Sequence, residues 1–147
     1  MGEGIRIEPA TAADLDAIHA LERDAFPSPW RREFFESELN ASGRYSIVAR
    51  RSSTLVGYLF AMYFFDEMHI NKIAVISAER RQGIANMLMH ECAAFARAQG
   101  VVAISLEVRQ TNSGAQEFYR FLGFAPSYVR PRYYPDGEAA VVMTKAV

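Results

Sequence analysis

A short glycine-containing segment, Arg80 to Ala85, has the composition of an anion-binding turn. It follows an apolar run, Ile70 to Ile76, and leads into a stretch with helical periodicity that ends near Gly100. Where such a turn enters a helix, several backbone N–H groups lack a partner and the helix dipole adds positive charge. Glycine at position 83 lets a bulky anion approach the backbone closely. The segment therefore predicts a site for a phosphorylated cofactor.

A carboxylate occupies the stretch 101–108, which alternates like a strand with two different faces. Glu107 is the charged residue on a face of small residues that it shares with Ala103 and Ser105. A carboxylate in such a place can act as a general base. It can equally be a surface group that pairs with Arg109 or with a neighbouring strand. These residues alone leave both interpretations open.

Tyr119 lies in the apolar stripe of a predicted helix that Thr111, Asn112 and Ser113 can cap. A phenol with its ordinary pKa of about 10 is protonated at neutral pH and can donate a proton. The same residue could be a core aromatic whose hydroxyl bonds to the backbone. The hydroxyl could also serve both purposes.

The histidines and the cysteine offer weaker candidates. His69 lies on the strand-like run before the anion-binding turn and could relay a proton or line a substrate site, although strand histidines are more often structural. His19 and His90 fall on predicted helices and form no ligand cluster, so no metal is implied. Cys92 lies in an apolar helical stripe, which predicts inert packing and no covalent intermediate on the thiol.

Length and composition indicate one globular domain, residues 1–147, because half of the chain is hydrophobic. The net charge of -1 gives no global attraction to nucleic acid or to anionic membranes, so we expect neither as a partner. Cys92 is the only cysteine and no signal peptide is recognisable, which predicts a reducing, cytoplasmic setting. The longest apolar stretch, Leu55 to Phe65, is shorter than the roughly 20 residues that span a bilayer.

Four strands are predicted in the first half of the chain, three of them consecutive. A short strand, Ile5 to Glu8, is followed after two helices by Tyr45 to Arg51, Leu55 to Phe65 and Met68 to Ile76. Short turns join the last three, which suggests an antiparallel meander. The central strand is the aromatic-rich stretch and should be buried.

Two helices are predicted between these strands. Thr11 and Asp14 form the start signal of the first. Ser28 can cap the second, with Pro29 in its first turn, where a missing N–H costs nothing. The second helix should run to about Leu39. The apolar residues that we expect it to bury are Trp30, Phe34 and Leu39.

The remaining chain predicts a strand around Ser127 to Tyr134, a turn at 135–137, and a final strand from Val141 to Lys145. Strands followed by helices in the middle, with further strands at both ends, indicate an α/β domain. We expect a mixed, mostly antiparallel sheet of about seven strands with about four helices on its two faces.

Several motifs in order point to a family. Arg80, Gly83 and Ala85 match the pattern Arg or Gln, two residues, Gly, one residue, Gly or Ala. Four further segments accompany it: Phe26-Pro27-Ser28-Pro29-Trp30, Leu106-Glu107-Val108-Arg109 followed by Asn112, the stretch from Tyr119 to Phe124, and Arg132-Tyr133-Tyr134-Pro135. With these motifs the chain resembles the Gcn5-related N-acetyltransferases (GNAT), and within them the ribosomal-protein alanine N-acetyltransferases of the RimI type. The resemblance covers nearly the whole chain.

The resemblance implies that acetyl-CoA is the cofactor. Backbone N–H groups from Gln82 to Asn86 would hold the pyrophosphate, the pantetheine arm would pair with the strand edge Ile73 to Val75, and the acetyl carbonyl would face the N–H of Val75. The cofactor-binding residues carried over are Ile73, Ala74, Val75, Arg80, Arg81, Gln82, Gly83, Ile84, Ala85, Asn86, Asn112 and Tyr119.

It also implies roles in catalysis and substrate binding. Glu107 resembles the family's general base, and Tyr119 the acid that protonates the departing thiolate. Direct attack by an amine is then the expected mechanism. The residues that resemble the walls of a peptide-terminus slot are Phe26, Pro27, Tyr133 and Tyr134, with His69 beside them.

The expected activity is therefore acetyl transfer to the α-amine of a protein N-terminus, with the alanine of ribosomal protein S18 as the family's target. Two alternatives remain: an acetyltransferase of the same fold that modifies a lysine side chain or a small amine, and a non-catalytic acyl-CoA sensor. We expect a monomer or a weak dimer.

Overall fold

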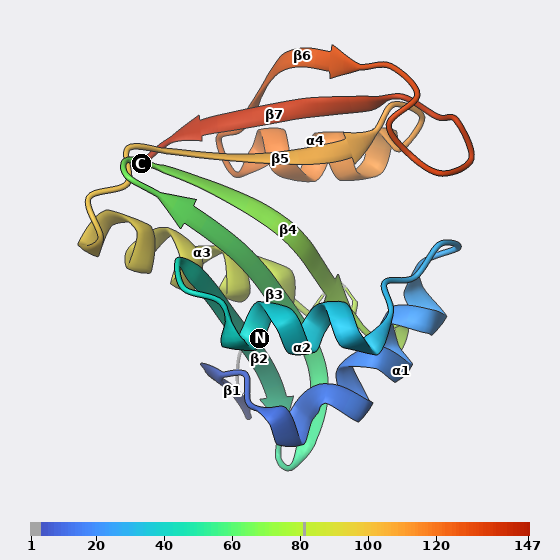
Figure 1. Cartoon of the computed structure of the whole chain (residues 1–147), viewed down its shortest axis with the longest axis vertical. Helices are drawn as coiled ribbons and strands as arrows, with labels where there is room; N and C mark the ends of the chain where they lie inside the picture. The colour runs from blue at the N-terminus through green and yellow to red at the C-terminus, as the bar shows by residue number, and fades with distance from the viewer. Residues whose placement is uncertain (1–3, 81) are drawn as a thin grey trace.

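The computed structural model describes residues 4–80 and 82–147, which form one twisted sheet with helices on both faces (Figure 1). The strands are β1 (Ile5–Pro9), β2 (Arg44–Arg51), β3 (Thr54–Phe64), β4 (Glu67–Val75), β5 (Ala103–Arg109), β6 (Ala125–Arg130) and β7 (Ala140–Ala146). The helices are α1 (Leu15–Ala25), α2 (Arg32–Asn40), α3 (Ile84–Ala98) and α4 (Ser113–Phe121), with short 3-10 turns η1 (Ala12–Asp14) and η2 (Ser77–Glu79).

The sheet has the strand order β1-β2-β3-β4-β5-β7-β6. β4 and β5 run parallel, and every other neighbouring pair is antiparallel. The prediction of a mixed, mostly antiparallel sheet is confirmed, as is the meander formed by β2, β3 and β4.

β4 and β5 separate soon after they begin. Their ladder joins Glu67–His69 to Ala103–Ser105, whereas β4 continues to Val75 and β5 to Arg109. Figure 1 shows the two strands diverging into a V. Beyond His69, the edge of β4 that faces this gap is therefore not paired with β5.

A β-bulge marks the place where β4 turns away. Lys72 pairs with Phe60 and Ile70 with Ala61, so Asn71 is an extra residue in the ladder with β3. A bulge bends its strand and increases the local twist. The bend directs the second half of β4 away from β5.

Buried side chains fill both faces of the sheet. α3 and α4 contribute Leu88, Cys92 and Tyr119 to one core group, and α1 and α2 contribute Ile18 and Phe35 to the other. Apolar residues at helical spacing give each helix one face to bury. In Figure 1, α1 and α2 lie in front of the sheet and α3 and α4 behind it, which confirms the predicted arrangement.

Local start and stop signals are confirmed at two helices. Asp14 accepts a hydrogen bond of 2.9 Å from the backbone N–H of Thr11, completing the predicted capping box. α3 ends at Ala98, and Gly100 just beyond it has φ +82°. Glycine takes this left-handed conformation at low cost, which is why it follows so many helix ends.

The predicted start of the second helix is wrong. α2 begins at Arg32, three residues beyond Pro29, and Ser28 does not cap it. Pro29 disfavours a helical conformation at Ser28. The helix therefore turns a different face inward, and Phe35 is buried while Phe34 is 57% exposed.

The last hairpin also differs from the prediction. β6 ends at Arg130, so Tyr133 and Tyr134 lie in the β6–β7 loop and not in a strand. Pro131 follows immediately and has no N–H to continue the ladder. The predicted turn is present, because the Gly137 N–H donates to the Tyr134 carbonyl at 2.8 Å.

Among the described residues, no helix combines the length and apolar character that a membrane crossing requires.

Candidate active site

The N-terminus of α3 is open, as an anion site requires. Gly83 is its N-cap with φ +79°, and the first helical bond runs from the Met87 N–H to the Gly83 carbonyl. The N–H groups of residues 83–86 therefore have no partner within the helix, and no described side chain caps them. A Cβ built on Gly83 would meet nothing within 4 Å. This concave, positively polarised backbone fits a phosphate group.

The residues around this turn differ in exposure. Arg80 is exposed and its Nε donates to the Val75 carbonyl at 3.4 Å, which ties the turn to the end of β4. Gln82 is exposed and Ile84 is buried. Arg81 lies outside the described residues. A cavity of about 90 Å³ adjoins the turn, and its lining is Leu21, Asp24, Ala25, Val75, Ile76, Ser77 and Arg80.

The predicted pantetheine edge borders the gap in the sheet. Ile73, Ala74 and Val75 pair with Leu59, Tyr58 and Gly57 of β3 on one side. On the other side, the ladder with β5 has ended at His69. The backbone of these three residues thus faces the space between β4 and β5, next to the start of α3.

Glu107 lies on the opposite side of this gap, on β5. Its Oε1 is 2.6 Å from His69 Nε2, and its Oε2 is 3.9 Å from Arg130 Nε. The side chain is 9% exposed. Of the two pairings that the sequence left open, the one with Arg109 is wrong and the one with a neighbouring strand is confirmed, because His69 lies on β4. Arg130, the more distant partner, lies on β6.

His69 is held at both ring nitrogens. Nε2 faces Glu107, and Nδ1 is 2.7 Å from Asn71 Oδ1. Burial alone would lower the pKa of His69, but the hydrogen bonds to Glu107 and Asn71 outweigh it and raise the pKa above its ordinary value. His69, a weaker candidate in the sequence analysis, is thus the direct partner of the Glu107 carboxylate.

Tyr119 is a buried residue of α4. Its ring packs edge-on against Phe118 and Phe124, with centroids 5.1 Å and 5.8 Å away. Burial, with a smaller contribution from Tyr134, raises its pKa to about 12. Tyr119 is therefore a core aromatic, as one interpretation held, and it keeps its proton at neutral pH.

Asn112 caps α4. Its Oδ1 accepts a hydrogen bond of 3.0 Å from the Ala115 N–H. This local role accounts for the asparagine, and its contact with a cofactor stays a prediction.

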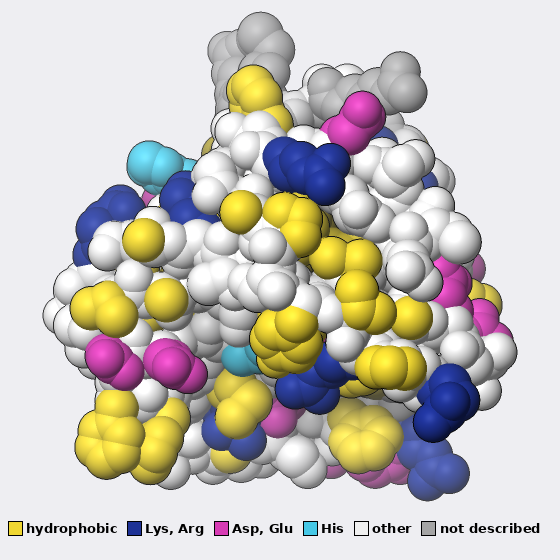
Figure 2. Space-filling model, turned by 90° about the horizontal axis from the view of Figure 1, so that it is seen from above, with side chains coloured by type: hydrophobic (Ala, Val, Ile, Leu, Met, Phe, Trp, Pro, Cys, Tyr) yellow, Lys and Arg dark blue, Asp and Glu magenta, His cyan; other side chains and the backbone are white. Residues whose placement is uncertain are grey.

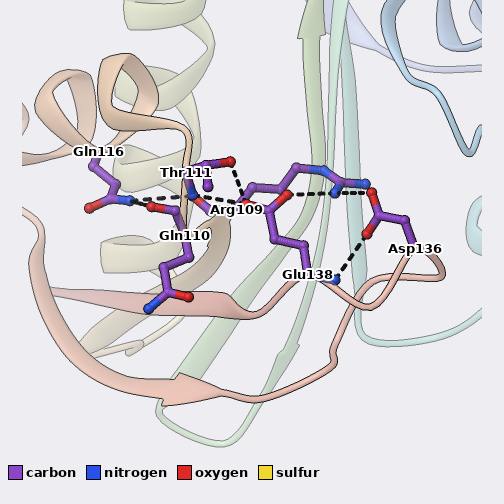
Figure 3. Close-up of polar contacts among 6 residues, drawn as sticks. All are labelled: Arg109, Gln110, Thr111, Gln116, Asp136 and Glu138. Atoms are coloured by element: carbon purple, nitrogen blue, oxygen red, sulfur yellow. Dashed lines mark hydrogen bonds and ion pairs between the residues drawn. The ribbon is translucent and has the colours of Figure 1, made fainter.

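A cluster of polar residues fastens the β6–β7 loop to the end of β5 (Figure 3). Arg109 Nη1 lies 2.8 Å from an Asp136 oxygen and 2.9 Å from a Glu138 oxygen. Glu138 also accepts from the N–H and the hydroxyl of Thr111. Hydrogen bonds to Thr111, followed by the one to Arg109, lower the pKa of Glu138. The loop is thus held by charge-assisted bonds that persist at neutral pH.

The same loop presents two tyrosines. Tyr133 and Tyr134 meet edge to face with centroids 5.0 Å apart. The Arg109 guanidinium lies 4.1 Å from the centre of the Tyr134 ring, and Tyr133 is 42% exposed. Burial, followed by Tyr133, raises the pKa of Tyr134 to about 12.

The connection between α1 and α2 forms the other predicted wall. Phe26 is half-buried, with Lys72 Nζ 3.7 Å from its ring centre, and Pro27 is exposed. Glu22, which is fully buried, accepts a hydrogen bond of 2.9 Å from the Trp30 backbone N–H. The connection is therefore fixed to α1 and β4 at defined points.

Four polar residues near Glu107 and Phe26 were absent from the sequence prediction: Glu38, Asn71, Lys72 and Arg130. Asn71 and Lys72 could have been recognised from the sequence, because they are polar residues that interrupt an apolar run inside a strand. Buried polar groups need partners. The partners are Glu38 for Asn71 and Glu22 for Lys72. They lie on α2 and α1, so the sequence of the strand could not identify them.

The cysteine considered in the sequence analysis is a packing residue of the core. Cys92 is buried, and burial raises its pKa to about 12, which leaves the thiol protonated and unreactive. Within residues 4–80 and 82–147, no group of three or more His, Cys, Asp or Glu residues could hold a metal ion.

The molecular surface over β6 and β7 mixes chemical types. Figure 2, seen from this end, shows basic, acidic and hydrophobic side chains interspersed. Tyr128 and Val129 of β6 are 54% and 48% exposed. This face therefore has no extended area of one charge.

Comparisons with known proteins show the family and agree with the fold. A family model described as the acetyltransferase (GNAT) family matches residues 15–124. The ribosomal protein bS18-alanine N-acetyltransferase of Escherichia coli (strain K12) is 31% identical over 134 residues, which cover 88% of this chain and 89% of that protein.

Two solved structures extend the comparison. The crystal structure of the ribosomal-protein-S18-alanine N-acetyltransferase from Escherichia coli has a TM-score of 0.90 at 27% identity, covering 97% of this chain and 94% of that chain. Arabidopsis thaliana NAA60 in complex with acetyl-CoA has a TM-score of 0.88 at 20% identity, covering 97% and 99%. The second comparison shows a common fold.

Proposed function

Because this chain belongs to the acetyltransferase (GNAT) family, it is an acetyl-CoA-dependent N-acetyltransferase, and we propose that its acceptor is the α-amine at a protein N-terminus. The observation that carries the proposal is the position of Glu107, nearly buried where β4 and β5 separate and backed by His69. A base in this gap lies between the candidate cofactor edge of β4 and the candidate substrate wall of the β6–β7 loop.

The cofactor site of the proposal consists of the α3 N-terminus and the free edge of β4. The N–H groups of residues 83–86 would hold the pyrophosphate, and the backbone of Ile73 to Val75 would pair with the pantetheine arm. Acetyl-CoA, when bound, supplies the acetyl group as an activated thioester. The unhindered space in front of Gly83 supports this placement.

Transfer joins the amine nitrogen to the acetyl carbon and releases the sulfur as a thiol, so the nitrogen gives up a proton and the sulfur gains one. At pH 7 only about a tenth of a free α-amine is neutral. Glu107 is proposed to take the proton from the amine. Tyr119, which holds its own proton at neutral pH, is proposed to give one to the sulfur.

The substrate is proposed to enter between two fixed segments. One is the α1–α2 connection with Phe26 and Pro27, and the other is the loop with Tyr133 and Tyr134. Phenolic and backbone groups there could bind the first peptide units. The relative from Escherichia coli is named for the alanine of ribosomal protein bS18, so we propose a ribosomal protein of this type as the target.

Strands from both ends of the chain share the sheet, and the proposal treats residues 1–147 as one catalytic domain acting in the cytoplasm, as a monomer or weak dimer.

Peptide acetylation tests the proposal directly. The protein is incubated with acetyl-CoA and an Ala-starting peptide, or with the same peptide carrying a blocked N-terminus and an internal lysine, and products are read by mass. We expect modification of the free terminus alone. Modification of the internal lysine would assign the chain to the lysine or small-amine class. Acetyl-CoA binding without any transfer would identify a sensor.

A further inference from the structure

Asn71 connects the candidate base Glu107, through His69, to helix α2. Its Oδ1 faces His69 Nδ1 at 2.7 Å, and its Nδ2 donates to Glu38 Oε1 of α2 at 3.3 Å. Asn71 is also the extra residue of the β4 bulge. The bulge therefore places a polar side chain, in an otherwise largely buried strand, against the ring of His69.

These contacts determine where the protons lie. A carboxylate oxygen only accepts hydrogen bonds, so Glu38 fixes which end of the Asn71 amide carries hydrogen. The carbonyl end then faces His69 and also only accepts, so Nδ1 carries the hydrogen. His69 Nε2 faces Glu107 Oε1 at 2.6 Å, and this carboxylate oxygen also only accepts, so in this geometry the ring carries a proton on each nitrogen and shares the Nε2 proton with Glu107.

We propose that Asn71 is a positioning residue for catalysis: it fixes the Nδ1–H form of His69, so that His69 Nε2 and Glu107 Oε1 together receive the proton released by the substrate amine. Once the shared proton has left, the ring keeps its hydrogen on Nδ1, and the unprotonated Nε2 and the ionised carboxylate form the active state. One proton leaves the amine nitrogen and comes to lie between these two atoms, and no other bond changes in this step. The inference rests on the proposed function of Glu107.

The charged and titratable groups around His69 come from several elements. Glu107 of β5 favours the protonated ring, and Arg130 of β6 opposes it. Glu38 of α2 is balanced by Arg44 of β2 at 3.1 Å. Burial, followed by the Glu107 carboxylate, raises the pKa of Tyr133 in the β6–β7 loop.

Lys72, the next residue of β4, pairs with Glu22. Asn71 is therefore the side chain through which α2 acts on the ring, and changing it alters a hydrogen bond to His69 without removing a charge.

Two variants are expected to change the pKa of the His69 ring in opposite directions. Asn71→Leu removes the acceptor for Nδ1–H, which frees the ring to adopt the other tautomer. The double variant Glu38→Gln with Asn71→Asp exchanges carboxylate and amide. It keeps an acceptor for the Nδ1–H and places a negative charge beside His69, at the cost of the ion pair between Arg44 and Glu38. A carboxylate partner raises a histidine pKa by about one unit or more.

The experiment measures the tautomer and pKa of His69 by NMR of isotope-labelled histidine in the protein without substrate, with His69→Gln to assign the signal. We expect the neutral ring to be Nδ1–H in the unmodified protein and to gain the Nε2–H form in Asn71→Leu. The pKa should fall in Asn71→Leu and rise in the double variant. Asn40→Leu, at the exposed end of α2, is the matched control and should change neither.

Kinetics then link the ring to the reaction. The acidic limb of kcat/KM for the Ala-starting peptide should move with the NMR pKa in both variants. The inference would be overturned if the His69 tautomer were unchanged in Asn71→Leu. It would also be overturned if the acidic limb of kcat/KM did not shift with the pKa measured by NMR. Because the NMR measurement needs no substrate, failure to acetylate any peptide would count against the proposed function alone.

Discussion

At the residue scale, Glu107 shows how position decides the role of a common side chain. On its own strand it is the charged member of a small-residue face. Its chemistry comes from His69 on β4 and Arg130 on β6, which enclose a carboxylate that is 9% exposed. An acid–base pair in a gap of the sheet is a candidate catalytic site because such surroundings favour proton exchange.

Replacing this carboxylate tests its role. Glu107→Gln keeps the shape and removes the base, so we expect kcat to fall about 10²- to 10⁴-fold with little change in KM for acetyl-CoA. The loss should shrink as pH rises towards about 8, because more of the α-amine is then neutral without help. Steady-state kinetics across pH provide the measurement.

Glu117→Gln, on the exposed face of α4, is the matched control and should behave as the unmodified enzyme. A Glu107→Gln enzyme within about threefold of normal kcat would exclude general-base catalysis by this residue.

At the element scale, α3 carries glycines in the same conformation at its two ends. Gly83 has φ +79° and Gly100 has φ +82°, and a Cβ at either would meet nothing within 4 Å. Only Gly83 is at the N-terminal end, where the free N–H groups and the dipole favour an anion. The two positions therefore separate backbone strain from ligand binding.

Alanine at each position should cost about 1–2 kcal/mol of unfolding free energy, because the left-handed conformation is strained for a residue with a Cβ. We expect Gly83→Ala to weaken acetyl-CoA binding about tenfold or more, and Gly100→Ala to leave it unchanged. Denaturant unfolding and calorimetric titration measure the two effects. Equal loss of affinity in both variants would place the cofactor elsewhere or trace the effect to fold stability.

The attachment of α1 to the sheet relies on a buried ion pair. Glu22 is fully buried and accepts from the Tyr58 hydroxyl at 2.5 Å and from Lys72 Nζ at 2.9 Å. Lys72 is 14% exposed. Removing one member of such a pair leaves an uncompensated charge in the core.

Lys72→Met should therefore destabilise the fold by about 3 kcal/mol or more. Adding Glu22→Gln should recover part of the lost stability, because the buried carboxylate that lacks its Lys72 partner is then replaced by a neutral amide. The surface pair Arg32–Asp16 offers the comparison, and Arg32→Met should cost about 1 kcal/mol or less. Chemical denaturation would contradict the interpretation if the two single variants lost similar stability.

At the scale of the whole molecule, the sheet consists of two parts that share a short ladder. β1 to β4 lie on one side and β5, β7 and β6 on the other, joined between Glu67–His69 and Ala103–Ser105. A ligand in the gap would contact both parts. Binding should then stabilise the molecule as a whole.

We expect acetyl-CoA at about 100 times its Kd to add about 2.7 kcal/mol of stability, which corresponds to a rise of roughly 5–10 °C in Tm. Thermal unfolding measures it, and hydrogen exchange should show protection on β4 and α3 together. Gly83→Ala at the same ligand concentration should show a smaller rise. Protection confined to residues outside β4 and α3 would contradict the placement.

The local features of this protein could be predicted from its amino-acid sequence. Alternating and helical patterns identified the strands and the main helices, and the turn at Gly83 was readable because glycine conformation and helix ends depend on neighbouring residues. The family motifs likewise lie in short segments. Even so, a helix start within a proline-rich segment was misplaced, and with it the choice of Phe35 over Phe34.

The interaction partners of the site residues, in contrast, follow from the packing of the folded chain. His69 and Glu107 are 38 positions apart in the chain, and their contact requires the parallel register of β4 and β5. The bulge at Asn71 and the link to Glu38 depend on how α2 packs across the sheet. Local propensities act over a few residues, whereas these distances follow from packing the whole chain, so no pattern along the sequence contains them.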